Sequence, residues 1–156
     1  MIENENTALV RRWFEELWNQ RRLETIDELL APDAVAYDLA GPNATVRGRA
    51  AFRAAAETLM GAFGEIHFTV EDIFGVDDRV AVRLTLRLEH TGQLGDLTPT
   101  GKRVTVPVMC MIEVRNGKIM GGWNNWDVAT ALRAANAPPG QTTLWPIAEQ
   151  EPATVK

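Results

Sequence analysis

The sequence contains no serine, only two histidines and a single cysteine among its 156 residues. The absence of serine excludes a hydrolase built on a Ser-His-Asp triad. His67, His90 and Cys110 are too far apart in the sequence for metal-ligand spacing, so we expect no metal. One cysteine also excludes an internal disulfide bond. Neither a Walker loop nor a GxGxxG motif is present, and we expect no cofactor.

Positive charge and long apolar runs are also scarce. Sixteen Lys and Arg against 21 Asp and Glu give a net charge of −5, which offers no electrostatic footprint for nucleic acid. The internal lysines, Lys102 and Lys118, each lie beside a glycine in a predicted turn, which argues against a buried Schiff-base lysine. No apolar run approaches the roughly 20 residues of a membrane span, and residues 1–6 lack the features of a signal peptide. We therefore expect a cytoplasmic protein that acts on a small molecule, away from membranes.

Helical spacing dominates the first part of the chain. Residues 7–20, 25–30 and 49–63 each carry apolar side chains on one helix face, and Thr25 with Glu28 predicts a capping box at the second helix. Residues 34–39 are predicted to be extended before the turn at Gly41 and Pro42. Three N-terminal helices and one strand are thus expected.

The spacing changes to a period of two from Ile66 onward. Strands are predicted from there to Glu71 and over residues 80–89, 104–115 and 118–126, with a hairpin at Asn116-Gly117 and a last helix over 128–135. This order predicts an α+β fold in which a cone-shaped, curved antiparallel sheet wraps around three N-terminal helices. We assign the domain to residues 1–136 and an extended, proline-rich tail to 137–156. A cavity between sheet and helices is the expected functional site.

Five stretches point to a family: residues 6–19, 26–33, 80–92, 99–104 and 116–127. In this order they resemble the SnoaL-like polyketide or "ester" cyclases of the nuclear transport factor 2-like superfamily, over about residues 6–136. The resemblance implies a cofactor-independent acid-base enzyme of the cyclase, isomerase or lyase type, acting on an apolar cyclic or polyketide-like carbonyl compound. The same superfamily contains epoxide hydrolases and non-catalytic binding proteins, so both remain alternatives.

The cyclase acid-base residues are replaced in this sequence. The aspartate of the last strand falls on Asn124, and its partner histidine on the preceding strand falls on Cys110. An amide cannot take up a proton near neutral pH, but its NH2 group can donate a hydrogen bond to a developing enolate oxygen. Asn124 is therefore either an oxyanion donor in the cavity, as the resemblance suggests, or a buried amide in a hydrogen-bond network of the core. Cys110 shares the inward parity of the neighbouring valines, which favours a small core residue over a group of the site.

A related branch suggests a different base. Residues 33–41 resemble the ketosteroid isomerase strand whose last aspartate moves a proton beside a carbonyl, and that position is Asp38. The oxyanion pair of the isomerase is not retained, because its positions fall near Trp13 or Phe14 and on Cys110. Asp38 could instead begin the turn that follows it, since aspartate is common there. For an epoxide hydrolase, Arg83-Leu84-Thr85 lacks the required second carboxylate.

Parity and composition supply the remaining candidates. His90 shares the inward parity of its strand, as either a structural or a catalytic group. We therefore predict Asp38 as the base, with Asn124 and His90 orienting the oxygen. Met109 and Met111 lie on the opposite, outer face, where an apolar patch predicts a homodimer, as the resemblance also suggests. The residues predicted to line the substrate pocket are Trp13, Phe14, Trp18, Phe63, Cys110 and Trp126.

Overall fold

The computed structural model describes residues 4–39, 43–126 and 128–136, and the predicted tail at 137–156 lies outside them. Two helical segments and a short helix come first, then a sheet interrupted by one long helix. In chain order the elements are α1 (Glu5–Arg12), the π-helix η1 (Trp13–Asn19), α2 (Glu24–Leu29), β1 (Leu30–Tyr37), β2 (Val46–Arg47), α3 (Gly48–Ala62), β3 (Phe63–Val76), β4 (Arg79–His90), β5 (Arg103–Arg115), β6 (Lys118–Asn125) and α4 (Val128–Asn136).

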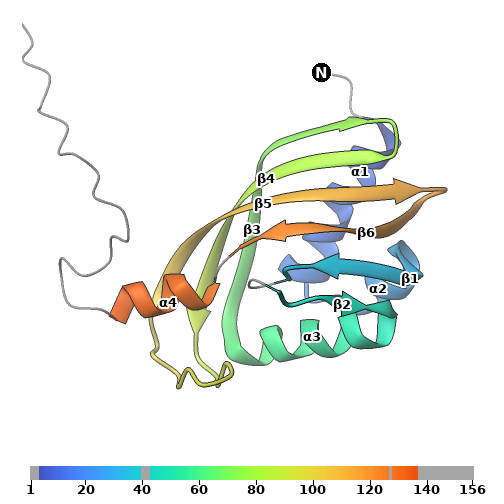
Figure 1. Ribbon diagram of the computed structural model, residues 1–156. Helices are drawn as coiled ribbons and strands as arrows, with labels where there is room; N and C mark the ends of the chain where they lie inside the picture. Colours follow the sequence, from blue (N-terminus) through green and yellow to red (C-terminus); the bar gives the residue numbers. More distant parts are fainter. Residues whose placement is uncertain (1–3, 40–42, 127, 137–156) are drawn as a thin grey trace, which may run out of the picture.

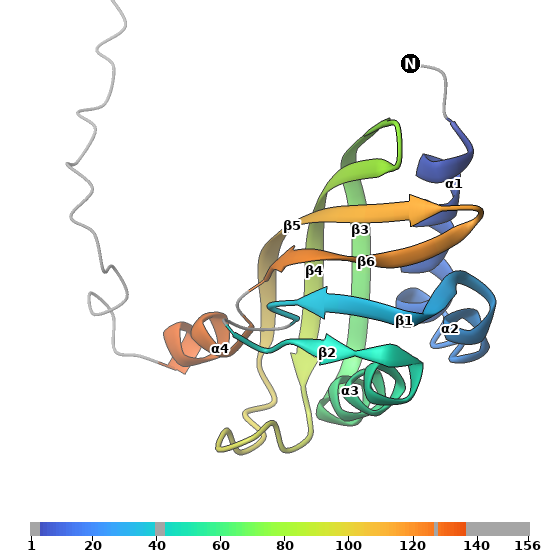
Figure 2. The same cartoon turned by 45° about the vertical axis from the view of Figure 1, so that its right-hand side comes forward.

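The six strands form one curved sheet in the order β2-β1-β6-β5-β4-β3. Helices α1, α2 and α3 cover its concave side, while α4 lies apart from them beyond the end of β6 (Figures 1 and 2). This is the predicted α+β cone. One pair departs from the antiparallel pattern, because β1 runs parallel to β6. That pairing joins strands far apart in the sequence, and it places β1 beside β6, the last strand.

Alternation along the strands decides which side chains reach the interior. On β4, Val80, Val82, Leu84, Leu86 and Leu88 are buried, and the residues between them are more exposed. The period-two prediction is therefore confirmed for this strand. The β5–β6 hairpin turns at Asn116 and Gly117 with φ of 49° and 69°, the left-handed pair that a two-residue type I′ turn requires.

The first predicted helix is present but changes its winding. It starts at Glu5, capped by Asn4 and Thr7, and becomes a π-helix from Trp13 onward. The wider π-helical turn carries the buried side chains of Trp13, Phe14, Leu17 and Trp18. The apolar spacing thus identified the buried face of this segment, although it did not distinguish a π-helix from an α-helix.

The predicted capping box of the second helix is wrong. Thr25 lies inside α2, and its hydroxyl donates to Glu16 over 3.0 Å instead of capping the helix. Glu28 pairs with Arg22, whose hydrogen bond lowers the pKa of the Glu28 carboxyl. These tertiary partners outcompete the local cap. Within the described ranges, no helix combines the length and apolarity needed to cross a bilayer.

Candidate functional site

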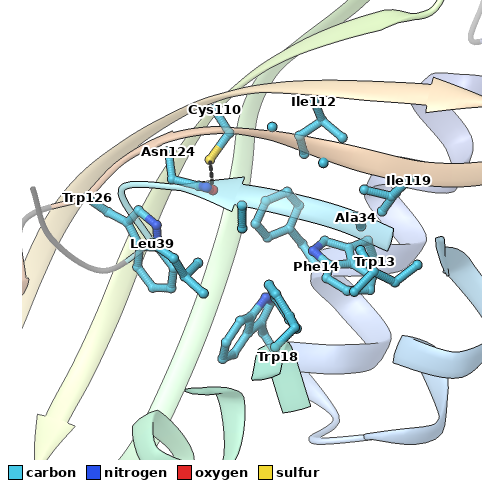
Figure 3. A pocket seen from close by; sticks show the side chains of 15 residues that line it. Trp13, Phe14, Trp18, Ala34, Leu39, Cys110, Ile112, Ile119, Asn124 and Trp126 are labelled. Carbon is cyan, nitrogen blue, oxygen red and sulfur yellow. Dashed lines mark hydrogen bonds between the residues drawn. The ribbon is translucent and has the colours of Figure 1, made fainter. Parts of the chain in front are cut away.

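A pocket lies between the concave face of the sheet and the helices. Its helical wall is aromatic and its sheet wall is made of small and aliphatic residues (Figure 3). The space between these walls that is free of atoms measures about 530 Å³, including the part open to solvent. The lining residues are Trp13, Phe14, Trp18, Leu30, Ala34, Ala36, Leu39, Phe52, Cys110, Ile112, Ile119, Gly121, Gly122, Asn124 and Trp126.

Small residues on two adjacent strands leave room for the pocket. Ala34 and Ala36 face it from β1, and Gly121 and Gly122 face it from β6. A Cβ on Gly121, whose φ is 142°, would lie 2.2 Å from the carbonyl oxygen of Val35. Glycine is therefore required for the close approach of β1 and β6. The Gly-Gly pair inside a predicted strand is the signal of this approach in the sequence.

Asn124 and Cys110 supply polar side chains to the sheet wall. They are paired across β5 and β6, and the Cys110 thiol donates to Asn124 Oδ1 over 3.4 Å. Asn124 Nδ2 donates to the backbone carbonyl of Tyr37 over 2.8 Å. This bond uses one of the two N–H groups of the amide and fixes its orientation. Burial raises the pKa of the Cys110 thiol to about 12, so the thiol is protonated at neutral pH.

Trp126 closes the pocket at the same end as Asn124. It follows β6 directly, and its side chain is 5% exposed. Its ring meets Trp18 and Phe68 edge-on, with centroid distances of 5.8 Å and 5.5 Å. The buried indole nitrogen has no hydrogen-bond partner in the described part of the chain. The ring is thus held in place by its apolar neighbours, and within the described ranges its nitrogen meets no acceptor.

Asp38 takes the turn position rather than a place in the pocket wall. Ala34 and Ala36 line the pocket, and continued alternation would add Asp38. However, β1 ends at Tyr37, and Asp38 has a left-handed backbone with φ of 55°. This reversal brings Leu39 into the wall, while the Asp38 carboxylate accepts the backbone N–H of Asn43 over 2.7 Å. This geometry favours the turn role of Asp38. Its role as the base stays a prediction, for a carboxylate beside the pocket rather than in its wall.

His90 and Phe63 do not join this site, which corrects their predicted placement. His90 is fully buried, as its parity indicated, but it lies at the end of β4. Its Nδ1 is 3.2 Å from the Thr100 hydroxyl, and its ring packs 5.6 Å from that of Phe63. Neither residue lines the pocket. Parity gave the correct face of the sheet, but it carries no information on the position along that face. The other five predicted pocket residues lie in the wall.

The Arg83-Leu84-Thr85 segment does not serve an epoxide-hydrolase site either. Arg83 pairs with Asp72 over 2.6 Å at an exposed position, and the Thr85 hydroxyl donates to Glu71. Both pairs lie on the outer face of the sheet. Across residues 4–39, 43–126 and 128–136, no cluster of three or more His, Cys, Asp or Glu side chains is arranged to hold a metal ion.

Comparison with known proteins assigns the family. The family model described as SnoaL-like polyketide cyclase matches residues 8–135. The chain belongs to this family. A search of curated proteins found no significant match for this SnoaL-like protein.

Solved structures share its fold over most of the chain. IdmH, a candidate polyketide cyclase from Streptomyces antibioticus, is 28% identical with a TM-score of 0.72, covering 86% of this chain and 100% of its own. AclR, a candidate hydroxylase from Streptomyces galilaeus, is 27% identical with a TM-score of 0.70, covering 86% of this chain and 87% of its own. A candidate SnoaL-like polyketide cyclase from Jannaschia sp. CCS1 has a TM-score of 0.77 at 22% identity, covering 89% and 99%. This last likeness shows the fold alone.

Proposed function

We propose that this SnoaL-like protein binds a largely apolar, cyclic or polyketide-like carbonyl compound in the pocket, with the carbonyl oxygen at Asn124. The observation that carries the proposal is the contrast between an aromatic and aliphatic wall and one amide fixed on it. Such a wall favours an apolar body, and the second N–H of Asn124 is a donor for an oxygen. A neutral ligand is favoured, because the described lining carries no charged side chain that would offset the desolvation of an ion.

The positions of the amide and the aromatic wall indicate how the compound is held. The carbonyl group would lie beside Asn124, and the larger apolar body would lie along the helical wall. Trp13, Phe14 and Phe52 would then contact the apolar body. Removing a hydrogen-bond donor to the oxygen, as in Asn124→Ala, should weaken binding about tenfold.

Tryptophan fluorescence tests binding directly, because Trp13, Trp18 and Trp126 line the pocket. The protein would be titrated with 1-tetralone, an anthraquinone and a 3-ketosteroid, with Asn124→Ala measured in parallel. Saturable quenching that is weakened in the variant would support the proposal. The absence of saturable quenching by all three compounds would contradict it.

Catalytic conversion of the bound compound is a second candidate function, supported by family membership and by the position of Asp38. Asp38 lies between Tyr37, whose carbonyl holds Asn124, and Leu39, which lines the pocket. A carboxylate at this rim could remove a proton next to the carbonyl while Asn124 donates to the enolate oxygen. No cofactor takes part in such a step. Cys110 cannot replace Asp38 as the base, because its thiol remains protonated at neutral pH.

Asp38→Asn separates conversion from binding, because an asparagine side chain can still accept the Asn43 N–H and preserve the turn. Each compound that binds would be tested for turnover by wild type and variant. Turnover lost about a hundredfold or more in the variant would establish an acid-base enzyme. Equal turnover in both would reject Asp38 as the base, and binding without any conversion would leave a binding module.

We also propose a homodimer formed through the outer face of the sheet. Several large apolar side chains are exposed there, including Met109 at 60% and Trp123 at 45%, beside Phe74 and Met111. They border a groove whose Arg83 and Asp72 supply both signs of charge. Analytical ultracentrifugation should show a dimer that Met109→Glu dissociates and that Ala51→Glu, on the exposed side of α3, leaves intact. A monomeric wild type would reject this assembly.

A further inference from the structure

The indole nitrogen of Trp126 is a buried donor with no partner in the described residues. Leaving a buried N–H unsatisfied costs about as much as losing a hydrogen bond, so such groups are rare in folded proteins and call for an explanation. The Trp126 side chain cannot simply turn its nitrogen toward solvent, because the ring is wedged between Trp18 and Phe68. The donor is therefore held in place with no acceptor among the residues that the structure describes.

The residue that carries this donor is also part of the pocket wall. Trp126 lines the cavity, and Asn124, two residues earlier, presents its side chain to the same side of the sheet. Figure 3 shows Trp126, Leu39 and Asn124 at one end of the pocket and Ile119 with Trp13 at the other. Asn124 and Trp126 thus bring two side chains with N–H donors to the same end of the pocket.

Building on the proposed function, we propose that Trp126 Nε1–H donates a hydrogen bond to an oxygen of the bound compound and selects neutral carbonyl compounds over their hydrocarbon analogues. An indole N–H can only donate, so the ligand atom it meets must be an acceptor. A carboxylate is disfavoured in this uncharged pocket. Trp126 is therefore a binding and positioning residue, and it completes the polar end that Asn124 begins.

Matched ligands test this role. 1-Tetralone and tetralin share a fused bicyclic frame and differ by the carbonyl oxygen. The five tryptophans give five indole signals in a ¹H–¹⁵N spectrum, and Trp126→Phe identifies the Trp126 signal by its loss. We expect 1-tetralone to move the Trp126 indole proton downfield, and tetralin to leave that proton without the downfield shift. Wild type should prefer 1-tetralone, and Trp126→Phe should reduce that preference about tenfold.

The control is Trp123→Phe, which removes an indole from the outer face of the sheet. It should keep the wild-type preference, and thermal melts of both variants show that they are folded. Two results would overturn the role of Trp126 without affecting the proposed function. Wild type could bind both compounds with equal affinity, or bound 1-tetralone could leave the Trp126 signal unmoved. If 1-tetralone, the anthraquinone and the 3-ketosteroid all fail to bind, the proposed function is overturned, and this role with it.

Discussion

Asn124→Asp restores the residue type that the resemblance to cyclases places at this position, and it should make stability depend on pH. In the wild type, Asn124 Nδ2 donates to the Tyr37 carbonyl over 2.8 Å. An ionised carboxylate would instead oppose that carbonyl with a second acceptor, in a pocket whose described lining has no charged side chain to compensate. Only the protonated acid can donate there. The pKa of the introduced carboxyl should therefore rise above the roughly 3.9 of a free aspartic acid.

The sign of the effect follows from proton binding. A raised pKa in the folded state means that the folded protein binds more protons than the unfolded one above about pH 4. Stability relative to the wild type is then greatest at low pH and is lost as pH rises toward the folded-state pKa. A lost hydrogen bond that leaves a buried carbonyl unpaired costs about 1–3 kcal/mol. At about 1.36 kcal/mol per pKa unit, this corresponds to a rise of about one to two units.

Urea unfolding between pH 4 and pH 8, followed by tryptophan fluorescence, measures this difference. The free energy of unfolding of Asn124→Asp should be close to that of the wild type at pH 4 and about 1–3 kcal/mol lower at pH 8. Asn124→Leu, which cannot ionise, should show a pH-independent loss relative to the wild type. A constant difference between Asn124→Asp and wild type across this range would refute the proposed bond to Tyr37 and the apolar surroundings of residue 124.

Two further outcomes follow from close packing and burial. Gly121→Ala should lower the free energy of unfolding by about 2 kcal/mol or more, because the new Cβ would lie 2.2 Å from Val35 O. By contrast, Gly61→Ala in α3 should raise it by about 0.5–1 kcal/mol, and urea unfolding that ranks them the other way would contradict the packing. Cys110 should react with iodoacetamide at pH 8 far more slowly in the folded protein than in urea, because burial raises its pKa to about 12. Equal rates would show that the thiol is exposed.

Most of the fold could be predicted from the sequence because its signals are local. Period-two alternation on β4 and the Asn116-Gly117 turn each depend on neighbouring residues. The parallel pairing of β1 with β6 joins distant segments, and no local pattern encodes it. The change from α1 to a π-helix also leaves the apolar spacing almost unaltered, so the spacing could not reveal it.

The residues that form the pocket walls could be predicted from the sequence better than the positions of the polar groups. Trp13, Phe14 and Trp18 follow from helical spacing, and Asn124 follows from the family resemblance. Asp38 could not be placed in this way, because its own left-handed backbone ends the alternation of β1. Leu39 therefore takes the place in the pocket wall that alternation would give to Asp38. The only sign of this change in the sequence is the Gly-Pro turn that follows Asp38.

The most direct test of the proposed binding site is calorimetric titration of 1-tetralone into wild type and Ala36→Leu. Ala36 lines the pocket, and the larger side chain would fill the small space beside Gly122. Ala51→Leu adds the same atoms at an exposed position of α3. We expect wild type and Ala51→Leu to bind equally and Ala36→Leu, folded by its thermal melt, to bind at least tenfold more weakly. Unchanged affinity in Ala36→Leu would show that the compound binds elsewhere.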